Sequence, residues 1–377
     1  MATPIAVLAA DTHLAPRSWS NRTIDGDAYY SFTQIIDFAV KHLVPVVLAG
    51  DVLDRQLNRA GPIVFLEQQL DRLAEVNLPC YFISGQHEAD DVPWLSSHRT
   101  ARQLHRQEIT LGPMHIYGLD YCPAGVLQAE LKLVPATCNM VVMHQVLAEF
   151  MGSIATPQGS IGDVPHARTV FVGDFHKYRD ITTKGADGQD VHVISPGSTC
   201  LQDISEDSDK YFVALCTDGT FKQVPLKTRI VLERGVLSTD AEIDQFVSAI
   251  PALIQAARAE AALRGYPENI RTPLVHVAYA AFLEGAARRL TQAVGANAHL
   301  FLKELAPVKQ EAVERLQLAQ ANGQRRAATM DGMAEAYLQQ QHLEALQPDV
   351  QRLLQTNDVP AELRRMREEA LAANTGA

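Results

Sequence analysis

Up to about residue 225, short apolar runs of strand length alternate with stretches in which apolar residues recur at helical spacing. Most of the runs end at Asp, Gly or His, residue types that turn a strand into a loop. Two helical stretches, 29–42 and 60–76, separate the first three runs. Strands that alternate with helices predict an α/β layered core. The six runs cover residues 5–10, 44–49, 80–84, 114–119, 140–144 and 169–172.

The pattern changes twice beyond these runs. Between residues 192 and 226 strands follow one another, which predicts a mixed β-sheet with an antiparallel end. After Arg229 an Ala-rich helix (238–264), an alternating strand (274–282) and a second helix (286–294) predict a small α+β cap domain. From Pro307 onward the sequence predicts only helix. We therefore expect three domains: a core (1–227), a cap (228–305) and a C-terminal helical segment (306–377).

Net charge, the length of the apolar runs and the cysteines exclude several classes of protein. The chain of 377 residues has a net charge of −11, which excludes a polycationic nucleic-acid coat. A contact with DNA would therefore need local basic groups, a metal site or a partner. The apolar runs are far shorter than a membrane span, and the N-terminus lacks an export signal. Five scattered cysteines without a CxxC indicate reduced thiols, so we expect a cytoplasmic protein that does not enter a membrane.

Five short segments place metal-ligating side chains directly after strand-like runs. Because loops at the carboxyl ends of strands converge in α/β sheets, residues far apart in sequence can meet there. A single D-x-H is weak evidence, but five such segments in order are hard to attribute to chance. The residues are Asp11 and His13; Asp51, Asp54 and Arg55; Gln86, His87 and Glu88; His144; and Asp174 with His176.

This order resembles the calcineurin-like metallophosphoesterases, whose pattern is D-x-H, GD-x-x-D, GNH-D/E, a lone His and GH-x-H. The resemblance covers about residues 1–225. Within that superfamily, the Pro196-Gly197-Ser198 turn and the following Asp209-Lys-Tyr-Phe212 are similar to SbcD, the nuclease subunit of the bacterial SbcCD complex, and to its bacteriophage exonuclease-subunit relatives. The resemblance implies that the core is a layered mixed β-sheet metallophosphoesterase domain.

The resemblance also implies a role for each site residue. It gives one metal ion to Asp11, His13, Asp51 and His176, and a second to Asp51, Gln86, His144 and Asp174, with Asp51 bridging. His87 is then a histidine that faces the substrate, and Glu88 lies behind it, fixing its tautomer or raising its pKa. Mixed imidazole and carboxylate ligands suit Mn²⁺, Fe²⁺ or Zn²⁺ better than Mg²⁺. We expect two divalent ions, Mn²⁺ first and Mg²⁺ as the alternative. Two such ions would activate a shared water and clamp the phosphoryl oxygens.

The chain departs from the family pattern at two ligand positions. Gln86 stands where Asn is usual, and Asp174 stands where the first His of GH-x-H is usual. Asp supplies an oxygen ligand and adds negative charge, whereas Gln carries its amide oxygen on an arm one methylene longer. Both changes are compatible with a metal site, and they leave its metal preference and its reaction rate open.

Other residues keep two interpretations each. Asp54 either caps the next turn or supports a ligand from behind, and Arg55 either neutralises a phosphate or forms a surface ion pair. Lys177 and Arg179 either follow a DNA backbone or are ordinary exposed cations. An acidic group after the PGS turn is expected to be a solvated loop. Its members are Asp203, Glu206, Asp207 and Asp209.

The C-terminal segment carries an amphipathic stripe at helical spacing. Such a stripe usually packs inside its own chain. Here it follows a complete domain and resembles the helices by which SbcD grips the coiled-coil base of its ATPase partner, so we favour a partner-binding role. The stripe contains Leu343, Leu346, Val350, Leu353, Leu363 and Met366.

These features predict a metal-dependent DNA exo/endonuclease subunit that hydrolyses phosphodiester bonds at DNA ends in an SbcCD-like repair or recombination complex. The implied partners are DNA, an SbcC-like coiled-coil ATPase and a second copy of the chain. The protein itself is expected in a bacterial cell, encoded by the bacterium or by a phage. Two alternatives stay open. One is a phosphodiesterase or phosphatase that acts on small phosphoesters. The other is a catalytically weak subunit that binds DNA ends, which Gln86 and Asp174 motivate.

Overall fold

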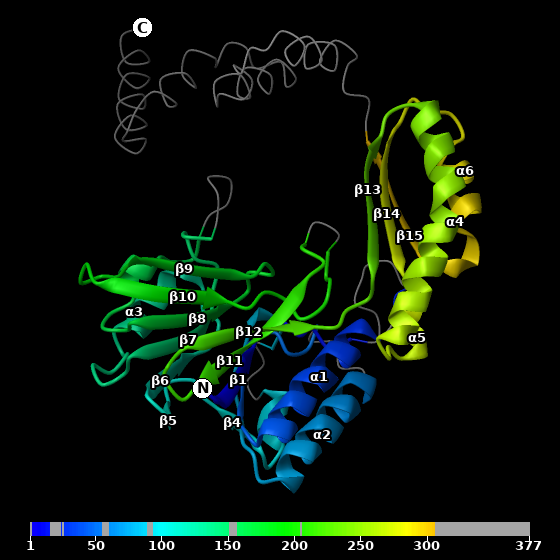
Figure 1. Ribbon diagram of the computed structural model, residues 1–377. Coiled ribbons are helices and arrows are strands. Elements are labelled where there is room, and N and C mark those ends of the chain that lie inside the picture. The colour runs from blue at the N-terminus through cyan, green and yellow to red at the C-terminus, as the bar shows by residue number, and fades with distance from the viewer. Residues whose placement is uncertain are drawn as a thin grey trace, which may run out of the picture. The chain divides into compact units, whose positions relative to one another are not determined.

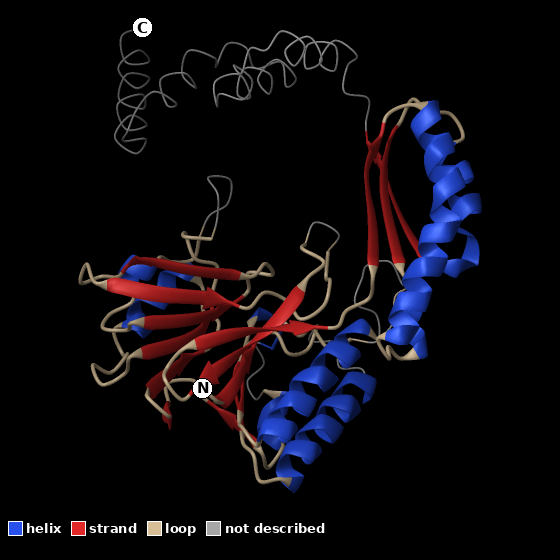
Figure 2. Ribbon diagram, viewed as in Figure 1, coloured by secondary structure: helices blue, strands red, loops and turns tan. Residues whose placement is uncertain are grey.

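The computed structural model describes residues 2–15, 24, 26–54, 60–88, 93–150, 157–203 and 206–305. Within these residues the core contains two six-stranded sheets, ordered β12-β11-β1-β2-β3-β4 and β5-β6-β7-β8-β10-β9 (Figures 1 and 2). The first sheet contains β1 (Pro4–Ala9), β2 (Val46–Ala49), β3 (Cys80–Ile83), β4 (Ala101–Gln103), β11 (Lys210–Cys216) and β12 (Phe221–Leu226). The second contains β5 (Glu108–Leu111), β6 (Met114–Leu119), β7 (Met140–His144), β8 (Thr169–Gly173), β9 (Arg179–Lys184) and β10 (Asp190–Ser195).

Both sheets are mixed, which confirms the predicted layered α/β class. Strands β1 to β4 are parallel, and β11 and β12 add an antiparallel end to the same sheet. In the second sheet β6, β7, β8 and β10 are parallel, while β5 and β9 are antiparallel edges. The sequence pattern indicated a single sheet. Strand patterning shows which faces are buried but not which strands share hydrogen bonds, so the division into two sheets could not be read from it.

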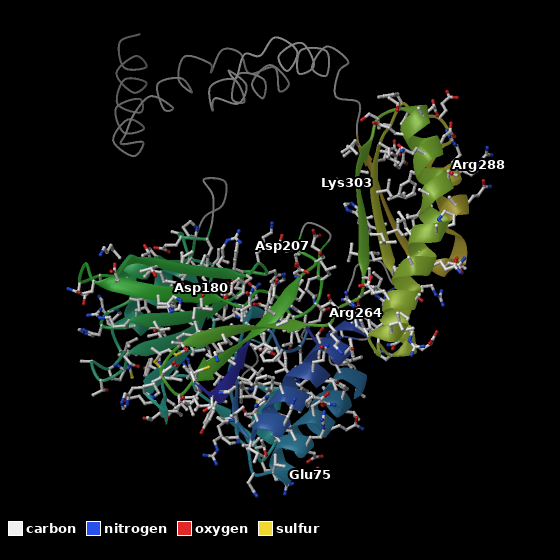
Figure 3. The ribbon with its side chains drawn as sticks, viewed as in Figure 1. Glu75, Asp180, Asp207, Arg264, Arg288 and Lys303 are labelled. Atoms are coloured by element: carbon white, nitrogen blue, oxygen red, sulfur yellow. The ribbon has the colours of Figure 1, made fainter. Side chains whose placement is uncertain are left out.

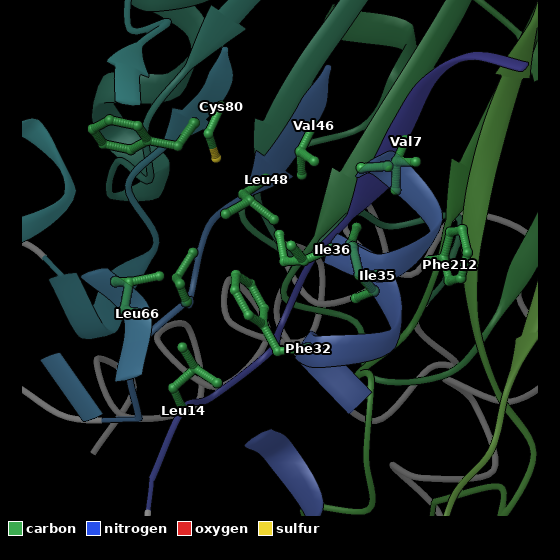
Figure 4. Packing of buried hydrophobic residues seen from close by; sticks show 14 of the residues in the cluster. Val7, Leu14, Phe32, Ile35, Ile36, Val46, Leu48, Leu66, Cys80 and Phe212 are labelled. Atoms are coloured by element: carbon green, nitrogen blue, oxygen red, sulfur yellow. The ribbon is translucent and has the colours of Figure 1, made fainter. Parts of the chain in front are cut away.

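The two sheets stack, and helices cover their outer faces. Alternate residues of β1 point to opposite sides: Ala6 and Leu8 pack between the sheets, whereas Val7 packs with Phe32 and Ile35 of α1 (Asp27–His42), as Figure 4 shows. Helix α2 (Ala60–Glu75) joins that outer layer, and α3 (Ala124–Leu131) covers the second sheet. Strands buried on both faces are apolar throughout, which explains the continuous runs in the sequence.

The cap sheet has the order β13-β14-β15, with strands β13 (Val231–Leu237), β14 (Leu274–Ala280) and β15 (His299–Leu305). Strands β13 and β14 are parallel, and α4 (Asp240–Leu263) connects them. Thr239 precedes α4 and caps it with a capping box. The Thr239 hydroxyl accepts from the amide of Glu242, and the Glu242 carboxylate accepts from the amide of Thr239. The helices α5 (Glu268–Arg271) and α6 (Ala286–Val294) complete the cap, and the exposed Arg288 projects from α6 (Figure 3).

Strands β13 and β15 were not predicted, because charged residues interrupt their apolar patterns. Helix α4 is long and apolar enough, by length and composition alone, to cross a membrane, and it is the one such helix among the described residues. Ile243, Phe246 and Ile250 on one of its faces are buried. The described residues of Met1–Tyr279 and Leu283–Lys303 form one compact unit. Residues 306–377, with their amphipathic stripe, lie outside the described residues, and the three-domain division stays a prediction.

A buried ion pair links the cap to the core within this compact unit. Arg229, 3% exposed, donates from Nη2 to Oδ1 of Asp27 at 2.6 Å and to the carbonyl oxygen of Asn269 at 2.9 Å. Asp27 is the first residue of α1, and Asn269 lies in α5. One guanidinium therefore holds a core helix and a cap helix together.

Removing one member of this pair should destabilise the protein strongly, because it leaves the other charge buried without its partner. Arg229→Met is expected to lower the free energy of unfolding by about 3–5 kcal/mol. Denaturant unfolding followed by circular dichroism measures the change. Lys184→Met, which removes one side of the exposed Lys184–Asp190 pair, should cost less than about 1 kcal/mol and is the control. Equal effects of the two substitutions would contradict this role of Arg229.

Candidate metal centre

The residues selected from the sequence converge at the carboxyl edges of the two sheets. Asp11 and His13 follow β1, Asp51 follows β2, and Gln86–Glu88 form a 3₁₀ turn after β3. His144 is the last residue of β7. Asp174 and His176 follow β8. Because β1 to β3 are parallel in one sheet and β7 and β8 are parallel in the other, these ends open at one place.

Two histidines and an aspartate form the first group of potential ligand atoms. The Nε2 atoms of His13 and His176 are 3.1 Å apart. Oδ1 of Asp11 lies 4.0 Å from Nε2 of His13 and 3.8 Å from Nε2 of His176. Ligand atoms this close to one another can share a single metal ion.

His144 is the centre of the second group, which also contains Asp11 and Asp51. Its Nδ1 donates to the carbonyl oxygen of Ala49 at 2.7 Å, so its Nε2 is left to face the site. That Nε2 lies 3.4 Å from Oδ2 of Asp51, 3.9 Å from Oδ1 of Asp11 and 4.0 Å from Oδ1 of Asp174. Asp11 and Asp51 thus lie between the two groups of ligand atoms.

Several polar atoms of the site are buried without a hydrogen-bond partner. They are Nε2 of His144, Nδ1 of His13 and Oδ2 of Asp174. A buried polar atom normally has a partner, and Nε2 of His144 has none although it faces the carboxylates of Asp51, Asp11 and Asp174, an arrangement that fits a cation between them. The residues present therefore suit divalent metal ions.

Electrostatics of the buried groups lead to the same conclusion. Burial lowers the pKa of His144, but the close contact with the Asp51 carboxylate and the charges of Asp11 and Asp174 outweigh it and raise the value to about 10. Burial raises the pKa of Asp11 to about 6, although His144 and His176 oppose the change. The carboxylates thus favour a positive charge beside Nε2 of His144, and a bound metal ion would supply one.

The backbone of the loops is held in an unusual conformation. Asp11, His13, Asp51 and Asp174 have φ values of 52°, 41°, 49° and 79°, in the left-handed region that side chains rarely adopt. Hydrogen bonds between the loops hold them there: the amide of His13 donates to the carbonyl oxygen of Asp51, and the amide of Asp174 donates to the Asp11 carboxylate. Strained backbone of this kind concentrates at functional sites.

Two glycines permit this packing. Gly50 has a φ of 84°, and a Cβ on it would lie 2.4 Å from Nδ1 of His144. A Cβ on Gly85 would lie 2.1 Å from Oδ1 of Asp51. Both residues must therefore lack a side chain for the ligands to approach.

The resemblance implied that Glu88 orients His87, but in the structure the backbone of Asp54 does so. Its Nδ1 contacts the carbonyl oxygen of Asp54, and its Nε2 lies 3.7 Å from Oδ2 of Asp51. The Glu88 carboxylate instead accepts from the amides of Val52, Leu53 and Gly85, and so fixes the loops after β2 and β3. Burial and the Asp51 charge raise the pKa of Glu88 to about 7, against the effect of these amides.

The two departures from the family pattern contact each other. Nε2 of the exposed Gln86 donates to Oδ1 of Asp174 at 3.2 Å. Of the tentative substrate contacts, Arg179 is exposed and stacks over Phe175, with its guanidinium carbon 5.4 Å from the ring centroid. Lys177 is half-buried, and Arg55 lies outside the described residues.

The acidic loop contains a residue that sequence reasoning missed. Glu206 is buried, not solvated, and its Oε1 contacts Nδ1 of His176 at 2.7 Å. Burial raises the pKa of Glu206, but His176 and Lys210 outweigh it and lower the value to about 2. One feature of the sequence could have indicated this ion pair: Glu206 lies four residues before Lys210, which begins β11. The acid-rich composition of the loop concealed it.

Comparison with known proteins supports the resemblance on which the site was predicted. The relatives are proteins described as "DNA double-strand break repair protein Mre11". The protein from Methanosarcina acetivorans is 26% identical over 249 residues, 62% of this chain and 40% of the relative. That from Sulfurisphaera tokodaii is 27% identical over 194 residues, 45% and 48% of the two chains. That from Sulfolobus acidocaldarius is 24% identical over 287 residues, 71% and 72%.

The chain spans about two fifths of the length of the two Methanosarcina relatives that it matches. No family model matches the sequence. Among solved structures, a Thermus thermophilus protein aligns with a TM-score of 0.39 and 13% identity over 59% of this chain and 99% of that one. The predicted resemblance to SbcD-type nuclease subunits is confirmed at modest identity through these Mre11-like relatives, and the layered mixed α/β core is consistent with a metallophosphoesterase core.

Mn²⁺ should stabilise the protein through these ligands. An ion that binds only the folded state at one hundred times its Kd adds about 2.7 kcal/mol to stability, so the midpoint of thermal unfolding should rise with Mn²⁺. Asp51→Asn should remove most of that rise, because Oδ2 of Asp51 lies near Nε2 of His13 in one ligand group and near Nε2 of His144 in the other. Asp187→Asn, at an exposed position, is the control. An equal rise in Asp51→Asn would place Mn²⁺ elsewhere.

Proposed function

We propose that this protein is a metal-dependent DNA exo/endonuclease subunit that hydrolyses phosphodiester bonds at DNA ends during repair or recombination. The observation that carries the proposal is the convergence of Asp11, His13, Asp51, His144 and His176, with Nε2 of His144 left unsatisfied in a buried space. The Mre11-like relatives support DNA ends as the substrate. A DNA nuclease of this kind would work in the cytoplasm of a bacterial cell. Its gene would be chromosomal or carried by a phage.

Two divalent ions fit the donor set. Asp11, His13, Asp51 and His176 would hold one ion, and Asp51, Gln86, His144 and Asp174 the other. The histidines in both sets favour Mn²⁺. The second set is richer in oxygen, because Asp174 replaces a histidine, and this keeps Mg²⁺ as the alternative. When bound, such ions supply Lewis-acid stabilisation of phosphoryl oxygens and activation of water.

The chain itself supplies orientation and proton transfer. His87 is about one-third exposed at its side chain, and its Nδ1 is held by the Asp54 carbonyl oxygen. A neutral His87 therefore keeps its proton on Nδ1 and presents Nε2 toward Asp51, where it can accept or share a proton near the scissile phosphate. Glu88 holds the His87 turn against the Asp51 loop through backbone amides. Lys177, Arg179 and Arg55 stay candidates for contacts with the DNA backbone.

The partners follow from the family resemblance. DNA, an SbcC-like coiled-coil ATPase and a second copy of this chain are the proposed partners. The stripe of Leu343, Leu346, Val350, Leu353, Leu363 and Met366 would bind the ATPase, since burying several such side chains contributes about 1.5–3 kcal/mol each before association costs. With a net charge of −11, the subunit gains from a partner that brings it to DNA.

His87 should act on the reaction rather than on the metal. His87→Ser is expected to lower turnover about 100-fold or more, because a positioned proton donor or acceptor contributes this much to rate. Mn²⁺ affinity, measured by calorimetry, should stay nearly unchanged. His115→Ser, at an exposed position on β6, is the matched control and should match the unmodified protein in both measurements. A parallel loss of Mn²⁺ affinity and turnover would make His87 a ligand.

Substrate choice separates the proposal from its rivals. A nuclease should degrade linear duplex DNA in Mn²⁺ and also hydrolyse a small chromogenic diester, whereas an enzyme for small phosphoesters should act on the diester alone. A weak DNA-end binder should bind the duplex and cleave neither, and Gln86→Asn with Asp174→His should then restore cleavage. Paired assays in Mn²⁺ and Mg²⁺ measure both reactions. Diester hydrolysis without DNA cleavage or binding would reject the nuclease.

A further inference from the structure

The loop between β10 and β11 contains four acidic residues with very different surroundings. Asp203, Asp207 and Asp209 are exposed, and Asp207 points away from the core in Figure 3. Glu206 is only 7% exposed. Four residues further on, at the start of β11, the Lys210 side chain is 3% exposed. One acid and one base of this segment are therefore turned inward.

Both oxygens of the buried carboxylate have hydrogen-bond donors. Oε1 of Glu206 contacts Nδ1 of His176 at 2.7 Å. Oε2 accepts from Nζ of Lys210 at 2.6 Å, from Oγ of Ser198 at 2.8 Å and from the amide of Gln202 at 3.2 Å. Lys210 also donates to Oγ of Ser198 at 2.8 Å, so the hydroxyl is left to donate its own proton to Glu206. This network connects directly to one potential metal ligand.

The contact with Glu206 determines which nitrogen of His176 faces the metal. A carboxylate only accepts hydrogen bonds, so Nδ1 of His176 must carry the proton. Nε2 is then left with its lone pair, 3.8 Å from Oδ1 of Asp11 and 3.1 Å from Nε2 of His13. A carboxylate behind a metal-bound histidine fixes the ring and makes it a better donor.

Packing alone does not account for the charges. Moving a lysine and a glutamate out of water costs free energy, and apolar residues of similar volume would fill the same space at equal or better stability. The Glu206 carboxylate does more than pair with Lys210, because its other oxygen contacts His176. Lys210 and Ser198 in turn hold the carboxylate in one orientation.

We propose that Glu206 is a positioning residue that, held by Lys210 and Ser198, fixes the tautomer and orientation of His176 for divalent metal binding. The affinity of the site for Mn²⁺ then depends on a loop that lies outside the five metal-ligand segments of the sequence. This inference rests on the metal centre of the proposed function.

The experiment compares Mn²⁺ affinity with stability in the full-length protein. Glu206→Gln is expected to weaken Mn²⁺ binding about 10- to 100-fold, as the loss of such a carboxylate does at other metal sites. Asp207→Asn, in the adjacent exposed residue, is the matched control and should bind Mn²⁺ as the unmodified protein does. Calorimetry with Mn²⁺ gives the affinity, and thermal unfolding without metal gives the stability.

A double variant separates positioning from folding. Glu206→Gln alone leaves Lys210 buried without its charge partner and lowers stability. Glu206→Gln with Lys210→Met removes that unpaired charge, so the unfolding midpoint should recover while Mn²⁺ affinity stays about 10- to 100-fold reduced. Recovery of both together would make the network purely structural and would overturn the inference, as would normal Mn²⁺ affinity in Glu206→Gln. Failure of the unmodified protein to bind Mn²⁺ would instead reject the metal centre, and this inference with it.

Discussion

Three carboxylates, those of Asp11, Asp51 and Asp174, crowd around the imidazole of His144 in a largely buried space, and their mutual repulsion is what the surrounding structure must offset. Asp174 exposes 8% of its side chain, and the other two expose almost nothing. The raised pKa of His144 reflects how strongly these carboxylates favour a positive charge between them. Everything that holds these groups together works against this repulsion.

Hydrophobic packing between the two sheets stabilises the fold against this repulsion. Apolar side chains such as Leu8, Val47 and Phe171 fill the space between the two sheets, and burial of each contributes about 1.5–3 kcal/mol. That packing fixes the strand ends, and the strand ends fix loops whose backbone enters the left-handed region at four site residues. The strain and the repulsion are tolerated because they are confined to one edge of a large, well-packed core.

Much of this arrangement was predictable from sequence. Parallel strands with both faces buried leave continuous apolar runs, and the polar residues that end them, such as Asp11, Asp51 and His144, mark the site. The rest depends on tertiary contacts. The role of Glu206 arises from a side chain turning inward among three exposed acids, and the His87 contact uses a backbone carbonyl, which has no sequence signature. Strand β13 was missed because its apolar pattern is broken by charge and by a register shift.

The order in which the loops occur along the chain has a consequence for how the molecule acquires its site. The contact between His13 and His176 joins residues 163 positions apart, and that between His144 and Ala49 joins residues 95 apart. Contacts of such sequence separation carry a high loop-closure entropy, which is recovered only when distant strands have paired. The unfolded chain therefore offers its ligands only as short local pairs, such as Asp11 with His13 and Asp174 with His176, and the full ligand set exists only where both sheets are folded.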